Sequence, residues 1–188
     1  VRCPLTAKAL THNGYDVPEK FAEPGLLVPS IYDVSSSPAE DYMLVPPHTD
    51  HNSCVWRHFP NVINPLSPPK IVTRQIARAK VVLSSSLHGL VFAEAMGIPA
   101  LWVRFSFEPK DILNGLGIGE TKFKDYYLGT DREPPSFVPY ILDESDIKRL
   151  LPTAVEPPSN LVSNAKSILD GAWENVLQWH NHVQDQAA

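Results

Sequence analysis

The sequence predicts an α/β fold built on an open, parallel, Rossmann-like sheet. The clearest indication is a strand, a helix and a strand in succession: residues 80–83 and 98–103 are largely apolar runs, and residues 84–96 between them begin with three serines and stop at Gly97. A unit of this length gives two parallel strands joined by a right-handed crossover. The strands contain few polar residues, which is typical of a sheet covered on both faces.

The other elements follow from proline, glycine and apolar spacing. A helix is predicted from Pro4 to a stop at Asn13 and Gly14, because proline suits a first turn and glycine the position after a helix end. We also expect strands at 42–45 and, more weakly, 61–63, helices at 68–79, 143–151 and 159–179, and a glycine-bearing loop at 106–124. The chain is thereby divided into an interlobe helix and linker (1–40), a Rossmann-like lobe (41–155) and a C-terminal helix (156–188) that packs on this lobe or on a partner.

Composition excludes several classes of protein. The 188 residues include 16 Lys and Arg against 21 Asp and Glu, a net charge of −5, and 43% of them are hydrophobic. Such a chain is too apolar to be intrinsically disordered, and its mild acidity disfavours nucleic-acid binding, which requires a basic face. No apolar run approaches the roughly 18 residues of a membrane span. Two cysteines cannot form a disulfide framework.

The strongest candidate site lies where the 80–83 strand runs into the following helix. Ligands of open α/β sheets bind beyond the carboxyl ends of the strands, and a helix N-terminus attracts an anion. Hydroxyl donors, a histidine that can move a proton and a glycine that permits close approach all lie at this junction: Ser84, Ser85, Ser86, His88 and Gly89. The alternative is that the serines only cap the helix and the histidine is an ordinary boundary residue.

A second polar loop follows the 42–45 strand and should open at the same sheet edge. It begins at Pro47 and His48, so His48 is a weaker candidate for binding donor or acceptor, or part of a polar surface loop. The spacing of His48, His51, Cys54 and His58 is compatible with zinc, but one cysteine at mixed offsets is not a standard zinc signature. We therefore predict no metal.

Cationic and aromatic residues supply further candidates. Arg2 precedes the helix that opens at Pro4, and Arg104 follows the 98–103 strand, so both guanidinium groups could clamp a carboxylate or a phosphate. Lys122, Lys124 and Tyr126 are weak candidates for holding an acceptor or donor, since sugar sites combine aromatic and charged side chains. The alternatives are a solvated terminal arginine and a solvated amphipathic helix.

Taken in order along about residues 1–130, these segments resemble the polysaccharide pyruvyl transferase family. The resemblance lies in residues 2–10, 14–18 and 23–27, in Pro47-His48, and in residues 84–95, 97–104 and 122–128. Several motifs in the right order are more specific than any one alone. One departure is Cys3, where the family usually has glycine.

The resemblance implies a lobe like the C-terminal lobe of a two-lobed GT-B-like transferase, with an N-terminal lobe preceding Val1. It implies transfer of a pyruvate ketal from phosphoenolpyruvate to paired hydroxyls of a glycan or lipid-linked sugar, with release of phosphate and without a cofactor. Arg2 and His88 match the family's substrate-binding positions, and His88 is the candidate acid. Whether these 188 residues act alone stays open.

Two other functions remain in competition. One is a sugar-nucleotide glycosyltransferase with the same architecture, for which Glu94 is the available carboxylate. The other is a non-catalytic lobe that binds a partner.

Overall fold

The computed structural model describes residues 3–34, 37–48, 58–104 and 118–187. Its centre is a parallel three-stranded sheet of β1 (Met43–Val45), β2 (Val82–Ser84) and β3 (Ala100–Trp102), in the order β1-β2-β3. Leu44 pairs with Leu83, and Leu83 pairs with Leu101, so the carboxyl ends of the three strands meet at one edge. The predicted open parallel sheet is confirmed. The weaker 61–63 segment contributes only an isolated bridge between Leu44 and Val62.

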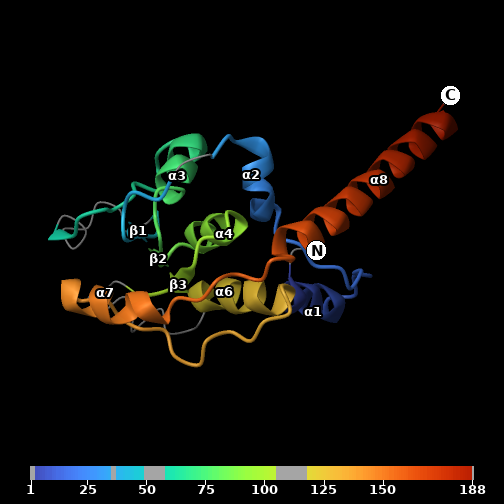
Figure 1. The fold of residues 1–188 in the computed structure, drawn as a ribbon. Coiled ribbons are helices and arrows are strands. Elements are labelled where there is room, and N and C mark those ends of the chain that lie inside the picture. Colours follow the sequence, from blue (N-terminus) through green and yellow to red (C-terminus); the bar gives the residue numbers. More distant parts are fainter. Residues whose placement is uncertain (1–2, 35–36, 49–57, 105–117, 188) are drawn as a thin grey trace.

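Alternate residues of the strands face two hydrophobic clusters, because side chains of a strand point to opposite faces in turn. On one face Val45, Val82 and Trp102 belong to a core with α4 (Leu87–Ala95), α3 (Pro69–Ile76) and α6 (Ile118–Gly129). On the other face Leu44 and Leu83 pack with α7 (Glu144–Leu150), which continues into a 3-10 turn at Leu151–Thr153. The sheet is therefore covered on both faces (Figure 1).

α4 is the central helix of the larger cluster. All but two of its residues are buried, and it ends where Gly97 adopts a φ of 72°, a conformation that glycine takes without strain. Because α4 is surrounded by other elements, its apolar residues do not gather on one face. It begins at the carboxyl edge of the sheet and runs back towards the opposite edge.

The prediction of a loop through 106–124 is wrong for residues 118–124, while residues 106–117 lie outside the described residues. α6 begins at Ile118 and includes Gly119, while Gly115 and Gly117 lie outside the described residues. Burial explains the helix: Phe123 stacks on Trp102 with ring centroids 4.4 Å apart, and Tyr126 is fully buried. Packing of these two rings outweighs the cost of about 1 kcal/mol for a glycine inside a helix.

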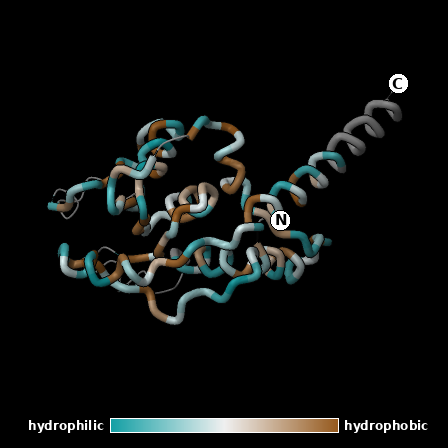
Figure 2. Tube along the Cα trace, viewed as in Figure 1, coloured by the Kyte–Doolittle hydropathy of each residue, from teal (hydrophilic) through white to brown (hydrophobic). Residues whose placement is uncertain are grey.

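The N-terminal and C-terminal segments pack on this core. α1 (Pro4–His12) lies beside α6, while the 3-10 helix η1 (Pro24–Leu27) contacts α4 and α8 (Leu161–Ala187), and α2 (Val28–Ile31) follows η1. The first turns of α8 cover the core, and the rest of the helix extends away from the body (Figure 1). Hydrophobic and hydrophilic positions alternate along its described part (Figure 2). Among the described helices none is both long and apolar enough to span a membrane.

Candidate functional site

The carboxyl edge of the sheet brings three sequence candidates to one side of the molecule. His48 follows β1, the Ser84–His88 turn follows β2, and Arg104 follows β3. The strands are neighbours, and all run the same way. His48 and His88 are both exposed at this edge, as the sequence predicted from their positions after adjacent strands.

Ser84 is not available to a ligand, contrary to its assignment as a donor-binding residue. Its side chain is fully buried, and its hydroxyl donates to the carbonyl of Ser86 at 2.7 Å and accepts from the N–H of Ser86 at 3.1 Å. These bonds close the turn between β2 and α4. Ser84 therefore fixes the shape of the turn.

Ser85 and Ser86 leave the turn with unsatisfied groups. Within the described residues the hydroxyl of Ser85 is buried without a hydrogen-bond partner. Ser86 is the N-cap residue of α4, but its side chain makes no capping hydrogen bond. Buried polar groups are rarely left unpaired, and the first N–H groups of a helix need an acceptor. Ser86 therefore leaves the N-terminus of α4 uncapped by its own side chain, and the Ser85 hydroxyl lies next to it in the turn.

His88 and Gly89 point in different directions from the first turn of α4. The His88 ring is exposed, with its centroid 5.9 Å from that of Phe92 one turn later. Gly89 is buried against the sheet: a Cβ there would lie 2.7 Å from Cγ1 of Val45 and would also meet the hydroxyl of Ser84. The expectation that Gly89 admits a ligand is wrong in this structure, because its missing side chain allows α4 to approach the strands.

Arg104 is held by groups of α6 and the 139–141 segment. Its guanidinium forms an ion pair with Glu120, donates to the hydroxyl of Tyr140 at 3.2 Å, and lies 5.5 Å from the Tyr140 ring centroid. Lys124, one turn after Glu120, pairs with the same carboxylate at 3.3 Å. The structure thus joins two candidates, Arg104 and Lys124, through a residue that sequence reasoning missed. Only the i, i+4 spacing of Glu120 and Lys124 signalled it.

Lys122 and Tyr126 do not join this group. Lys122 is exposed, with its ammonium 5.6 Å from the Phe123 ring centroid. Tyr126 is 1% exposed and donates from its hydroxyl to Glu94 at 2.5 Å. Its assignment to a binding surface is therefore corrected: in this structure the phenol lies inside the protein.

Glu94, Tyr126 and Arg132 form a buried polar network at the far end of α4. The guanidinium of Arg132 donates to both carboxylate oxygens of Glu94, at 2.8 and 2.7 Å, and to the hydroxyl of Thr130 at 3.0 Å. It also lies over the rings of Tyr126 and Tyr127. Burial and the nearby Glu94 raise the pKa of Tyr126. Burial, the largest single influence, lowers the pKa of Arg132, but the hydrogen bonds and charge of Glu94 together with Tyr126 and Tyr127 raise it overall.

Asp125 of α6 binds the N-terminus of α1. Its carboxylate accepts the N–H of Leu5 at 2.5 Å and both the N–H and the hydroxyl of Thr6, at 3.2 and 2.6 Å. Cys3, the N-cap residue of α1, makes no side-chain capping bond, so Asp125 supplies the cap from 120 residues away. The predicted donor-binding Arg2 lies outside the described residues.

The histidines of the loop after β1 gather no metal ligands within the described residues. No group of three His, Cys, Asp or Glu side chains that could hold a metal occurs there. His48 and His58 are described and exposed, whereas His51 and Cys54 lie outside the described residues.

Comparison with known proteins identifies the family. A family model described as polysaccharide pyruvyl transferase matches residues 4–106, which include the sheet, α4 and the Ser84–His88 turn. A relative from Acanthamoeba polyphaga mimivirus, "Uncharacterized protein L143", is 31% identical over 124 residues, which is 61% of this chain and 40% of the relative. No solved structure matches the chain.

The family model covers more than half of the chain, and the chain therefore belongs to the polysaccharide pyruvyl transferase family. It spans less than half the length of the mimivirus relative.

Proposed function

We propose that the intact protein transfers a pyruvate ketal from phosphoenolpyruvate to two hydroxyls of a glycan, and that this chain carries the donor site. The proposal rests on family membership and on one observation: the start of α4, at the carboxyl edge of the sheet, has donor groups that the side chain of its N-cap residue does not satisfy. Ser86 provides no cap, the Ser85 hydroxyl has no partner among the described residues, and His88 is exposed beside them. A phosphate or carboxylate would satisfy these N–H and O–H donors.

The chemistry assigns a role to each group of this edge. The acid protonates the methylene carbon of phosphoenolpyruvate, which leaves a cation at the carbon that bears the phosphate ester. One acceptor hydroxyl adds to that carbon and the second displaces inorganic phosphate; one of their two protons restores the acid, and the other leaves with the phosphate. His88 is the exposed group of the turn that can deliver a proton at neutral pH, and it acts as the general acid.

Arg104 and Lys124 complete the donor site, where the donor replaces Glu120 as the partner of these cations. In this structure both cations are bound to Glu120 at the edge. The carboxylate of phosphoenolpyruvate would take the place of Glu120 on the planar fork of Arg104, which suits bidentate binding of a carboxylate. Glu120 thereby holds the cations in place until the donor arrives.

The glycosyltransferase alternative is disfavoured by the position of Glu94. A carboxylate that binds the sugar of a nucleotide must be exposed at the ligand edge. Glu94 is 5% exposed, both of its oxygens are bound by Arg132, and it lies at the end of α4 away from His88.

Product analysis of the full-length protein separates the two reactions. With phosphoenolpyruvate and a glycan acceptor we expect inorganic phosphate to appear together with an acceptor that gains a pyruvate ketal, detected by mass spectrometry and by its methyl proton signal. With nucleotide sugars we expect no nucleotide release. Release of nucleotide, or absence of phosphate release across a panel of glycans with vicinal or 4,6-placed hydroxyls, would contradict the proposal.

A further inference from the structure

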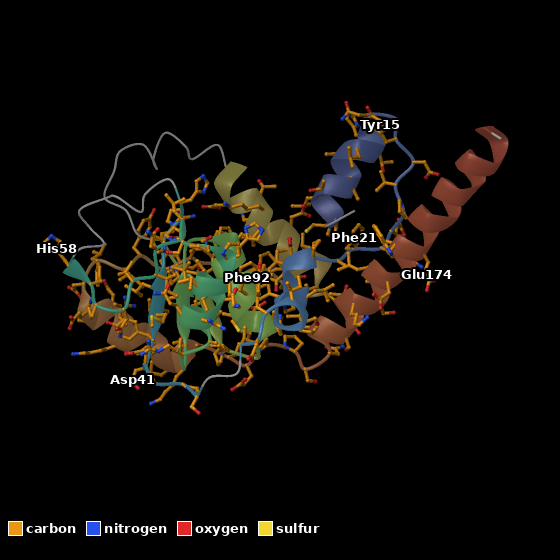
Figure 3. The ribbon with its side chains drawn as sticks, turned by 90° about the horizontal axis from the view of Figure 1, so that it is seen from above. Tyr15, Phe21, Asp41, His58, Phe92 and Glu174 are labelled. Atoms are coloured by element: carbon orange, nitrogen blue, oxygen red, sulfur yellow. The ribbon has the colours of Figure 1, made fainter. Side chains whose placement is uncertain are left out.

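A cavity lies near the end of α4 opposite His88. Its volume is about 620 Å³, within the 300–1,000 Å³ typical of small-molecule sites. Three segments form its walls: residues 19–26, residues 129–132 at and just after the end of α6, and residues 158–168, which include the first two turns of α8. Figure 3 labels Phe21 on the linker, on the side of the molecule from which α8 extends.

The cavity combines an apolar wall with exposed amide and hydroxyl groups. Phe21, Leu26 and Ile168 supply apolar surface, and Phe21 offers an aromatic ring. Asn160 lies just before α8, and Asn164 and Ser167 lie on its first two turns; all three side chains are exposed. Amides and hydroxyls both donate and accept, so this wall can pair with a ligand that carries many hydroxyls.

Arg132 provides a fixed donor in the same cavity. Its guanidinium is held by Glu94, by Thr130 and by the rings of Tyr126 and Tyr127. Three of its five N–H groups make these hydrogen bonds, which leaves two for a ligand. Because the side chain is already ordered, a ligand bonded to it loses little free energy to side-chain ordering.

The charges of the cavity exclude an anionic ligand. Its ionisable side chains are Glu19, Lys20, Glu23, Asp131 and Arg132. The charge of Arg132 is balanced by its ion pair with Glu94. The remaining charges that line the cavity are three carboxylates and one cation, Lys20. A phosphate or nucleotide would be repelled, whereas an uncharged ligand would not.

We propose that this cavity binds a neutral saccharide, as a site for the acceptor glycan separate from the reacting edge. Glu94, which holds Arg132, lies six residues after His88 along α4, about 9 Å at 1.5 Å per residue. The saccharide bound here is therefore a different unit of the glycan from the one that is modified. The identification of that saccharide as the acceptor rests on the proposed function; the saccharide site does not.

Titration calorimetry of the full-length protein tests the site without phosphoenolpyruvate. The probes are neutral tri- to hexasaccharides of glucose, galactose and mannose, together with the same chains carrying a carboxylate. We expect at least one neutral series to bind, the carboxylated chains to bind more weakly, and both Asn164→Ala and Ser167→Ala to weaken binding about five- to tenfold. Ser163→Ala is the matched control, one turn earlier on α8 and outside the cavity wall, and should bind as the wild type does.

Absence of binding by every neutral chain, or equal weakening by Ser163→Ala and Ser167→Ala, would overturn the saccharide site. The two proposals fail separately. Phosphate release from phosphoenolpyruvate with no saccharide binding at the cavity leaves the proposed function standing. Saccharide binding lost in the Asn164 variant, in a protein that never releases phosphate, leaves the saccharide site standing.

Discussion

The two ends of α4 carry polar clusters of opposite character. At its start, the Ser85 hydroxyl lacks a partner among the described residues, Ser86 does not cap the helix and His88 is exposed. At its end, both oxygens of Glu94 accept from Arg132, and one of them also accepts from the hydroxyl of Tyr126. A polar group whose bonds are complete inside the protein stabilises the fold, whereas one left incomplete is ready to bind. The comparison assigns binding of the donor to the first cluster and, through the completed bonds of Glu94, stability to the second.

The largest loss of stability is expected from breaking the hydrogen-bonded cluster of Glu94, Tyr126 and Arg132 at the end of α4. Glu94→Ala leaves the cation of Arg132 without its partner between α4 and α6, and should lower the free energy of unfolding by about 3–5 kcal/mol. Urea denaturation measures it. Asp41→Ala is the control, because the ion pair of Asp41 with Lys80 is exposed on both sides and is screened by solvent, so its loss should change stability little. Equal losses in the two variants would mean that the network is not a stabilising one.

A smaller loss is expected where α4 meets the sheet. Gly89→Ala places a methyl group 2.7 Å from Val45 Cγ1 and should cost about 1–3 kcal/mol. Gly171→Ala in α8 meets no atom within 4 Å and should instead stabilise the protein by about 0.5–1 kcal/mol. Thermal unfolding of the two variants compares them. A neutral Gly89→Ala would show that α4 does not pack tightly on β1.

The polar cluster at the end of α4 also predicts how the stability of the fold depends on pH in alkaline solution. Burial, and then Glu94, raise the pKa of Tyr127 to about 12 from its ordinary value of 10.0. The folded protein therefore holds this proton more tightly, and the resulting stability is present below pH 10 and is lost as pH rises towards 12. Tyr127→Phe should reduce the fall of melting temperature between these values. An identical pH profile in the wild type and the variant would contradict this.

Local signals predicted the elements around the candidate site. The strand–helix–strand unit was visible because apolar runs, three serines and Gly97 follow one another within about 25 residues. Its position at the sheet edge followed from the rule that parallel strands share a carboxyl edge. Local spacing misled at α6, where Gly115, Gly117 and Gly119 resembled a loop although the burial of Phe123 and Tyr126 maintains a helix from Ile118.

Pairings between distant residues could not be predicted. Glu94 and Arg132 are 38 residues apart, and Asp125 reaches Leu5 across 120 residues. Such bonds depend on how α6 packs against α4 and α1, which no spacing along the chain records. The inward position of Gly89 escaped notice for a related reason: α4 is apolar nearly all round, so its sequence does not distinguish the face that meets the sheet.

The central claim is that His88 delivers a proton at the open end of α4. The most direct test measures phosphoenolpyruvate binding and phosphate release in the full-length protein with His88→Gln and His88→Ala. Glutamine keeps a hydrogen-bond donor but cannot act as an acid at neutral pH. We expect the glutamine variant to bind phosphoenolpyruvate and to lose turnover by about 10²–10⁴-fold, with an unchanged melting temperature. Turnover near that of the wild type in both variants would contradict the account.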